Sequence, residues 1–350
     1  YEAHRIEFAR KQSIPDDVDT VVVVNPRNWD ERQRWELNRA LRSGKSVILA
    51  VQSYTMDYGG GQRGIQVTSQ SVPHGVNELL ETYGLKVSDD FLMDLQHETL
   101  SIQTGRSLGP FQMSTPVKLP THILLTAQSA NPDVSISNRL SSIFYLWGAP
   151  LEVDEDQLKE KDLQVTPLLF SGPQSWSVPF RAGELRREDI TPPEKFEPGK
   201  PLAVLVEGRF PDAFEGQERP AWPKPPTMPG QPPPPEDPEE APAPELPVRP
   251  GRLLLVGCGM MWQDNFLPSG GNMPFFLNSV DALTLGEELI HVRTKTKVDR
   301  LIPKLSRAKK SWYHFFVIGL APIVLAAFGI ARLGLRRRVK DAYLREVARA

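Results

Sequence analysis

The sequence predicts an α/β protein with a Rossmann- or flavodoxin-like core, a β-rich portion and a C-terminal transmembrane helix. Three observations predict this architecture. Apolar strand-like runs alternate with segments of helical period in the first third of the chain, strand-like runs broken by Pro, Gly and Ser follow, and an uncharged apolar run lies near the end. Alternating strands and helices are typical of a parallel sheet with helices on both faces. With 350 residues, the chain has room for one large or two ordinary domains.

Residues 1–110 are predicted to form the first part of the α/β core. DTVVVVNP at 19–26 and KSVILAVQ at 45–52 are apolar, β-branched runs of the kind that form buried parallel strands. Between them, Asp30 can cap a helix that continues to about Leu41, where a Ser-Gly pair ends it.

A second helix is predicted over HGVNELLETYG at 74–84, and a short strand, LKV, follows at 85–87. The order strand, helix, strand, helix, strand predicts a doubly wound sheet with right-handed crossovers.

The middle of the chain differs in composition from the first part. Residues 111–215 contain strand-like runs separated by Pro, Gly and Ser, and we expect this portion to be β-rich. Residues 216–250 contain 14 Pro among 35 residues, which predicts a flexible, partly polyproline loop inserted into a domain. A ligand for a proline-reading domain is the functional alternative for this loop.

Residues 251–292 are predicted to return the chain to the α/β core. GRLLLVG has the signature of a buried strand, and PFFLNSVDALTLG at 274–286 has apolar residues at helical spacing. A juxtamembrane segment is expected at 293–311, where cations are frequent.

The run WYHFFVIGLAPIVLAAFGIA predicts a transmembrane helix over 312–332. Twenty uncharged residues at about 1.5 Å each span roughly 30 Å, the thickness of a bilayer core. Aromatic rings and arginines flank the run as interfacial anchors: Trp312, Tyr313, Arg332, Arg336, Arg337 and Arg338. The basic tail at 333–350 favours a cytoplasmic C-terminus. The main domain would then lie on the periplasmic side of the inner membrane.

Composition excludes several function classes. Lys and Arg total 41 against 43 Asp and Glu, so no basic balance points to nucleic acid as a partner. A single cysteine excludes an intramolecular disulfide framework and a cysteine-cluster zinc site. The six histidines show no metal-ligand spacing. We therefore predict no metal, no cofactor and no catalytic residue.

Two further motifs favour structural interpretations. DYGGGQRG at 57–64 contains a G-x-G-x-x-G pattern, but no helical period follows it, so a glycine loop is favoured over a nucleotide site. SDDFLMDLQHE groups Asp89, Asp90, Asp94 and Glu98, for which a solvated loop is favoured over acid–base chemistry.

Cys258 and Asn25 each follow a predicted core strand. The carboxyl ends of strands in open α/β sheets are where ligands bind, so both residues are predicted to line a pocket. A nucleophilic Cys258 would need a general base, and no motif places a histidine beside it. A buried cysteine that acts as a small apolar residue is the favoured interpretation.

The ordered segments together resemble the GldG-type auxiliary component of gliding-motility-associated ABC transport systems. The resemblance covers nearly all of the chain. It is carried by IPDDVDTVVVVNPRNWDERQRWELNRALRSGKSVILAVQ, VTPLLFSGPQSWSV, KPLAVLVEGRFPDAF, GRLLLVGCGMMWQDNF, GNMPFFLNSVDALTLGEELIHVRTK and the terminal apolar run. The resemblance implies a fold similar to glutamine-amidotransferase-like domains, without their active site.

The same resemblance implies the partners. A bacterial accessory subunit of this kind would be anchored in the lipid bilayer, beside an ABC permease and, through it, a cytoplasmic ATPase. Its extracytoplasmic domain would bind or gate a substrate, and it could form a homo- or hetero-oligomer. Two alternatives stay open: a tethered glycan- or lipoprotein-binding module without a transporter, and a hydrolase or amidotransferase-like enzyme that uses Cys258.

Overall fold

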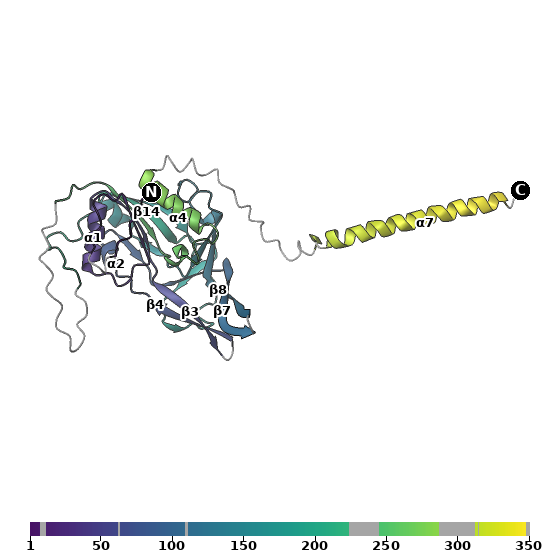
Figure 1. Cartoon of the computed structure of the whole chain (residues 1–350), viewed down its shortest axis with the longest axis horizontal. Coiled ribbons are helices and arrows are strands. Elements are labelled where there is room, and N and C mark those ends of the chain that lie inside the picture. Colours follow the sequence, from purple (N-terminus) through teal and green to yellow (C-terminus); the bar gives the residue numbers. More distant parts are fainter. Residues whose placement is uncertain are drawn as a thin grey trace. The chain divides into compact units, whose positions relative to one another are not determined.

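The computed structural model describes residues 1–7, 12–61, 64–108, 111–223, 245–286, 312–313 and 315–347 (Figure 1). The chain divides into two compact units, Tyr1–Lys297 and Val298–Ala350, and each is described here by itself.

A five-stranded mixed sheet forms the centre of the first unit. Its strand order is β1 (Thr20–Val24), β2 (Ser46–Ala50), β15 (Gly251–Val256), β14 (Pro201–Gly208) and β11 (Leu163–Phe170). β1, β2 and β15 are parallel to one another, whereas β14 is antiparallel to both β15 and β11. A parallel pair needs a crossover connection, and α1 (Glu31–Arg42) supplies it between β1 and β2.

Local sequence fixes where α1 begins. The Asp30 side chain accepts a hydrogen bond from the Gln33 backbone N–H, and the Gln33 side chain accepts one from the Asp30 N–H, which completes a capping box. The helix predicted from Asp30 to about Leu41 is therefore confirmed.

The central sheet is buried on both faces, which explains its continuous apolar strands. Val47 and Leu49 of β2 lie in one apolar cluster, which also contains Leu37 of α1. Ile48 lies in the other cluster with Phe275 of α4 (Asn272–Leu285). Successive residues of a strand face opposite sides, so each strand contributes to both cores.

Four smaller sheets surround this centre. One three-stranded sheet has the order β13 (Gly183–Glu184), β4 (Gly64–Ser71) and β3 (Tyr54–Gly61), and another has the order β7 (His97–Leu108), β8 (Phe111–Thr126) and β9 (Ser142–Leu146). Two further sheets are strand pairs: β10 (Leu151–Val153) with β5 (Leu85–Val87), and β12 (Ser175–Val178) with β6 (Phe91–Asp94). Short helices complete the described part of the unit: α2 (Asn77–Glu81), α3 (Glu155–Glu160) and 3-10 turns at Ala127–Ser129 and Met260–Trp262.

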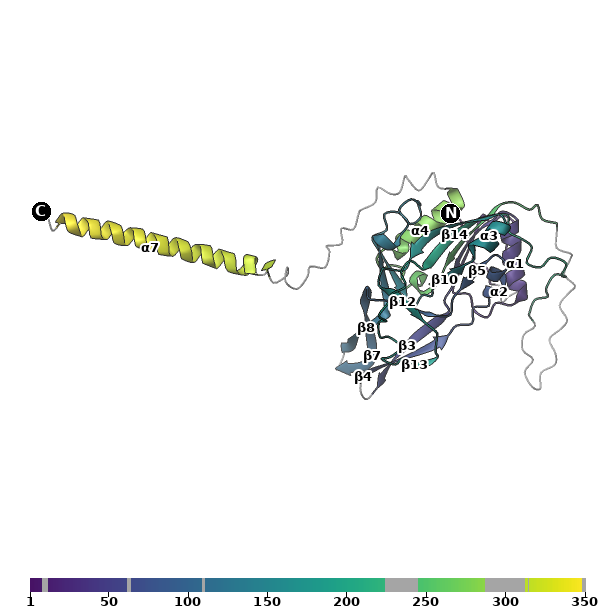
Figure 2. The same ribbon diagram turned by 180° about the vertical axis from the view of Figure 1, so that it is seen from behind.

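Two long antiparallel hairpins, β3–β4 and β7–β8, extend from the same side of the unit. Both lie away from α1, α2 and α4 in two opposite views (Figures 1 and 2). β3 contacts β7, so the hairpins lie side by side.

The predicted Rossmann- or flavodoxin-like, glutamine-amidotransferase-like core is wrong. The predicted second βα unit does not return to the central sheet, because α2 has only five residues and β5 pairs with β10 instead. One of the five central strands, β14, runs antiparallel to the other four, and most other strands form separate small sheets. The fold is a sheet-rich mixed α/β arrangement.

The second unit corrects the predicted transmembrane helix over 312–332. A π-helix covers Phe315–Gly319, and α7 begins only at Leu320 and continues to Val347. Its uncharged residues ahead of Arg332 span about 18 Å, against about 30 Å for a bilayer core. None of the helices in the described part of the chain combines the length and apolar character that crossing a membrane requires. The inner-membrane placement, with a periplasmic domain and a cytoplasmic tail, is wrong with it.

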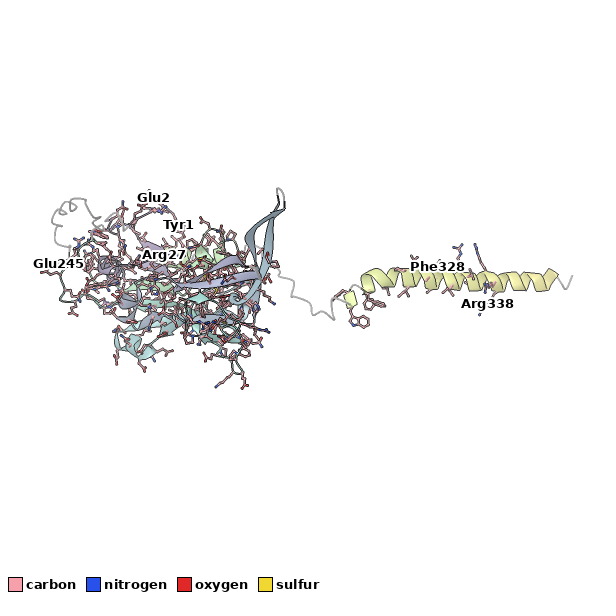
Figure 3. All side chains as sticks on the ribbon, turned by 90° about the horizontal axis from the view of Figure 1, so that it is seen from below. Tyr1, Glu2, Arg27, Glu245, Phe328 and Arg338 are labelled. Carbon is pink, nitrogen blue, oxygen red and sulfur yellow. The ribbon has the colours of Figure 1, made fainter. Side chains whose placement is uncertain are left out.

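The residues predicted as anchors are all solvent-exposed in the second unit. Trp312 and Tyr313 precede the π-helix and have exposed fractions of 62% and 60%. Arg332, Arg336, Arg337 and Arg338 lie on α7 together with Phe328 (Figure 3).

The whole predicted juxtamembrane segment lies outside the described residues. The centre of the Pro-rich insertion and the end of the tail do so too. The predicted domain boundaries stay predictions.

Candidate functional site

The three parallel strands end beside one another, at the edge where Asn25 and Cys258 were predicted to meet. Asn25 follows β1, Gln52 follows β2 and Cys258 follows β15. The backbone N–H of Asn25 donates to the Ala50 carbonyl (2.8 Å), and that of Gly259 donates to the Val51 carbonyl (3.1 Å). The backbone of this edge is therefore held by hydrogen bonds between neighbouring strand ends.

Gln52 is the central side chain of this edge and is buried. Its Oε1 accepts from the backbone N–H groups of Gly259 (3.1 Å) and Met260 (3.0 Å). Its Nε2 donates to the carbonyls of Tyr54 (2.8 Å) and Trp147. All hydrogen-bonding positions of the amide are occupied, so Gln52 links the central sheet to the strands behind it.

Cys258 is fully buried beside Gln52. Its Sγ donates to the Leu146 carbonyl at 3.2 Å, and burial raises the pKa of the thiol to about 12. Only the thiolate is a nucleophile, so a protonated, inaccessible thiol is a poor one at neutral pH. The geometry supports the interpretation of Cys258 as a small core residue.

Asn25 adopts a left-handed backbone conformation with φ of 54°. Its side-chain oxygen and nitrogen are both shielded from solvent and have no hydrogen-bond partner among the described residues. Gly259 packs directly against it, since a Cβ on Gly259 would lie 1.7 Å from Asn25 Oδ1. The proposal that Asn25 and Cys258 line a pocket stays a prediction.

A β-bulge creates a second buried polar group that the sequence did not reveal. His97 of β7 pairs with Ile123 of β8, but Thr99 pairs with Lys118, so β8 has extra residues at this point. Thr121 and His122 lie in this bulge and are both fully buried. Bulges redirect side chains, and this one turns His122 toward the interior at the base of the hairpin.

His122 belongs to a hydrogen-bonded cluster with Tyr58 and Trp147. The Tyr58 hydroxyl lies 2.6 Å from His122 Nε2 and accepts from Trp147 Nε1 at 3.0 Å. The hydroxyl can donate to Nε2 or accept from it, depending on the tautomer of His122, and His122 Nδ1 is buried without a hydrogen-bond partner among the described residues. Burial lowers the pKa of His122 to about 4 and raises that of Tyr58 above its ordinary value.

Trp147 connects this cluster to the strand ends. Its carbonyl accepts from Gln52, its indole N–H donates to Tyr58, and its backbone has φ of 52°. Left-handed backbone is strained for a large residue and persists where the surroundings determine it. A continuous polar network, defined here as Gln52, Trp147, Tyr58 and His122, thus joins the central sheet to both hairpins.

The glycine motif at 57–64 forms the end of a hairpin. Gly59 and Gly61 lie on β3, Gly64 begins β4, and Gly61 pairs with Gly64. A strand, not a helix, follows the motif, so it lacks the helix N-terminus on which a dinucleotide site depends.

The acidic residues of the motif after β5 separate in the structure. Asp89 is exposed, whereas Asp94 is buried at the end of β6, and burial raises the pKa of its carboxyl. Its Oδ1 accepts from the Gln96 backbone N–H at 2.8 Å. Asp94 therefore organises the turn into β7.

An open surface groove of about 740 Å³ lies beside β5, β10 and α3. Its lining is largely acidic: Glu81, Gly84, Leu85, Lys86, Glu152, Val153, Asp154, Glu155, Asp156 and Gln157. Asp154 caps α3 through the Gln157 N–H, and Lys86 lies between Glu81 and Glu152 at 3.9 and 4.0 Å. These contacts account for much of the groove as ordinary surface structure.

A buried ion pair holds the chain beyond β14 against α1. Arg32 Nε lies 3.0 Å from Glu36 Oε1, and both side chains are almost completely shielded from solvent. Arg32 also donates to the Pro220 carbonyl at 2.9 Å, and its guanidinium lies 4.5 Å from the Trp222 ring centre. A guanidinium over an aromatic ring is attracted to it, so the pair fixes the start of the Pro-rich segment.

Comparison with known proteins places these features in a family. The family model ABC_transp_aux, described as an ABC-type uncharacterized transport system, matches residues 1–282. No curated protein matches the chain. Among solved structures, the mmIFT52 N-terminal domain is similar at a TM-score of 0.39 and 15% sequence identity, with 77% of this chain and 78% of that chain covered. The match over residues 1–282 shows that the chain belongs to the auxiliary-component family of ABC-type transport systems.

Proposed function

We propose that this chain is a non-enzymatic accessory subunit that binds the permease of an ABC transport system, and through it the ATPase, with its paired hairpins β3–β4 and β7–β8. Membership of the family supports association with an ABC transport system. The observation that carries the proposed surface is the pair of adjacent hairpins extending from the first unit (Figures 1 and 2).

The hairpins are held in place by apolar packing and hydrogen bonds, as a rigid docking element requires. Leu100 and Ile102 of β7 and Ile65 and Val67 of β4 pack against the same apolar core. The network of Gln52, Trp147, Tyr58 and His122 connects both hairpins to the central sheet. Hydrogen bonds between buried polar groups favour one arrangement of a core, which supports a defined surface on the hairpins.

The outer sides of the hairpins suit a protein partner. β3 and β7 are the end strands of their sheets and contact each other, so the two hairpins present a joint surface. Exposed side chains on β7 and β8 include Thr99, Ser101, Ser114 and Lys118, which offer hydrogen bonds with little charge.

The buried titratable groups support the non-enzymatic part of the proposal. Cys258 is protonated and inaccessible, and His122 is neutral and held by Tyr58. Neither group is open to a substrate. Binding or gating of a transported substrate would then be indirect, through the conformation of the permease. The narrower assignment to a GldG-type subunit of a gliding-motility system is part of the same proposal, and it rests on the sequence segments alone.

Co-purification tests the proposed surface. The tagged full chain should recover a permease and an ATPase subunit from its native cells. Ser101→Arg, on the exposed side of β7, should reduce that recovery at least several-fold. The matched control is Gln164→Arg on β11, which is also an exposed polar strand residue and should leave recovery unchanged. Equal recovery with both variants would eliminate the hairpins as the docking surface, and recovery of neither subunit by the parent chain would eliminate the proposed function.

A further inference from the structure

β1 is an edge strand of the central sheet in the described part of the chain. It stands at the end of the strand order, and no described strand pairs with its outer side. Its residues, TVVVV, include no Pro, no charge and no bulge, the usual devices that keep an edge strand from pairing. Val22 has an exposed fraction of 42%, although it is a β-branched residue in the middle of the strand.

The hydrogen bonds to β2 identify the backbone groups that face outward. Asp19 accepts from Ser46, and Asn25 donates to Ala50, so alternate residues from Asp19 to Asn25 face β2. Because the N–H and C=O of one strand residue point to the same side, those of Thr20, Val22 and Val24 face outward. These three residues offer a regular ladder to another strand.

Charges at the two ends of β1 are opposite. Asp17 and Asp19 precede the strand and Arg27 follows it, and all three are exposed. Neither Asp17 nor Arg27 has an ion pair within the described residues. An antiparallel copy of the same strand would bring Arg27 of one chain to the acidic end of the other, whereas a parallel copy would bring acid to acid.

We propose that two copies of this chain form a dimer by antiparallel pairing of their β1 strands across a two-fold axis. Val22 pairs with Val22 of the second copy, and Thr20 pairs with Val24. This register uses every outward-facing backbone group of the strand. The interface is isologous, so one edge serves both copies and the assembly closes as a dimer.

The neighbouring helix enlarges the surface. Thr20 Oγ1 lies 2.9 Å from Thr284 Oγ1, which places the C-terminal end of α4 beside the start of β1. Met273 and Leu277 of α4 have exposed fractions of 40% and 43%. Val22 and α4 lie on the same side of the sheet, since Val24 and α4 share one apolar cluster. Pairing of the β1 strands would therefore bring the two α4 helices toward each other.

Cysteine cross-linking tests the register in the full chain. Directly paired residues in an antiparallel sheet have Cα atoms about 5.5 Å apart, within the range of about 4.4–6.8 Å for a disulfide. Val22→Cys should form an intermolecular disulfide under mild oxidation. The native Cys258 is buried and does not interfere. Leu95→Cys, at an apolar residue with a similar exposed fraction of 38%, is the matched control and should form no intermolecular disulfide.

Light scattering and charge exchange test the dimer itself. The parent chain should have the mass of two copies, and Val22→Lys should raise the dissociation constant by about tenfold or more. Arg27→Asp should weaken the dimer, and the double variant Asp17→Arg/Arg27→Asp should restore it. Both residues are exposed, so neither substitution alters the core.

Three results would overturn the proposal. In the first, the parent chain is monomeric by itself, and Val22→Lys abolishes its binding to a different protein. This result would assign the β1 edge to that protein. In the second, the chain self-associates, but Val22→Lys leaves the self-association unchanged and Val22→Cys forms no cross-link. This result would place the contact elsewhere. In the third, the dimer of the double variant Asp17→Arg/Arg27→Asp is as weak as the dimer of Arg27→Asp. This proposal uses the β1 edge, not the hairpins, so it can fail while the proposed function stands.

Discussion

The hydroxyl of Tyr58 on β3 lies 2.6 Å from Nε2 of His122 on β8, and this contact between residues 64 apart in sequence joins the middle of the β3–β4 hairpin to the base of the β7–β8 hairpin. Trp147 donates to the same hydroxyl. Each hairpin alone would leave a polar group buried without a partner. The contact therefore gives Tyr58 and His122 Nε2 a hydrogen-bond partner, and it favours this relative placement of the two hairpins.

Tyr58→Phe should destabilise the first unit. The substitution keeps the ring but leaves His122 Nε2 and Trp147 Nε1 without their partner, and a buried unsatisfied group costs about 1–3 kcal/mol. Urea unfolding should show this loss in the free energy of unfolding. Tyr313→Phe, at an exposed tyrosine, should change it by less than about 0.5 kcal/mol. Equal effects at both sites would contradict the assigned role of the hydroxyl.

Stability should fall as the pH is lowered from about 6.5 toward 4. The folded state lowers the pKa of His122 to about 4, chiefly by burial, so the unfolded chain binds more protons in this interval. The stabilisation by neutral His122 is complete above the unfolded pKa and is lost as pH falls through this window. At about 1.4 kcal/mol per unit, the loss approaches about 3 kcal/mol. The free energy of unfolding should be measured against pH for the parent chain and for His122→Gln. The difference between the two curves cancels the contribution of all other titrating groups. A difference that does not change with pH would refute the assignment.

Cys258 should be unreactive in the folded chain. Thiol reagents need the thiolate, and burial both shields Sγ and raises its pKa to about 12. At pH 8, Ellman's reagent should react at least about 100-fold more slowly with native protein than in urea, because reaction requires opening of the core. Cys258→Ala should retain co-purification of the transporter subunits. Rapid native labelling would contradict this placement.

Arg32→Met should be more destructive than the double variant Arg32→Met/Glu36→Leu. Removing Arg32 leaves the buried Glu36 carboxylate with only a longer ion pair to Arg219 at 3.9 Å among the described residues, and breaking a buried pair costs up to about 3–5 kcal/mol, whereas replacing both partners with apolar residues is often near neutral. Glu36 also accepts from Ser13 at 2.9 Å, so the double variant loses one further hydrogen bond. Thermal unfolding of the two variants measures the difference, and a double variant no more stable than the single one would exclude this account.

Sequence pattern predicted the elements whose contacts are local or whose strands are continuous and apolar. α1, β1, β2, β15 and α4 lie within about two residues of their predicted positions. Capping residues and apolar periodicity act over a few residues, so they can be recognised without knowledge of the fold.

Topology and the buried network could not be predicted in the same way. Nothing in LKV at 85–87 distinguishes a core strand from one that pairs with β10, because the choice depends on a partner far along the chain. His122 looked like one of several scattered histidines, since its hydrogen-bond partner, Tyr58, comes from another strand. A long β8 with Pro and two consecutive buried polar residues was the available signal of a bulge.

The uncharged run near the C-terminus misled for a different reason. Composition predicts whether a segment is apolar, but a span also needs one continuous helix of sufficient length. Here the π-helix at Phe315–Gly319 precedes α7, and α7 reaches Arg332 too soon.

Gly259→Ala should disrupt the end of β15, and a change at Asn25 should rescue it. A Cβ on Gly259 would lie 1.7 Å from Asn25 Oδ1, closer than any real contact, and 3.2 Å from the Ala50 carbonyl. Displacing Asn25 from its tight left-handed turn should lower the free energy of unfolding by about 2 kcal/mol or more.

Asn25→Gly removes the clashing side chain and suits the positive φ, so Asn25→Gly/Gly259→Ala should recover most of that loss. The control is Gly59→Ala, where the nearest atom to a new Cβ is 4.0 Å away and little change is expected. The coupling energy from urea unfolding of the single and double variants measures the contact directly. If the two losses simply add, the side chain of Asn25 does not occupy the space that Gly259 leaves for it.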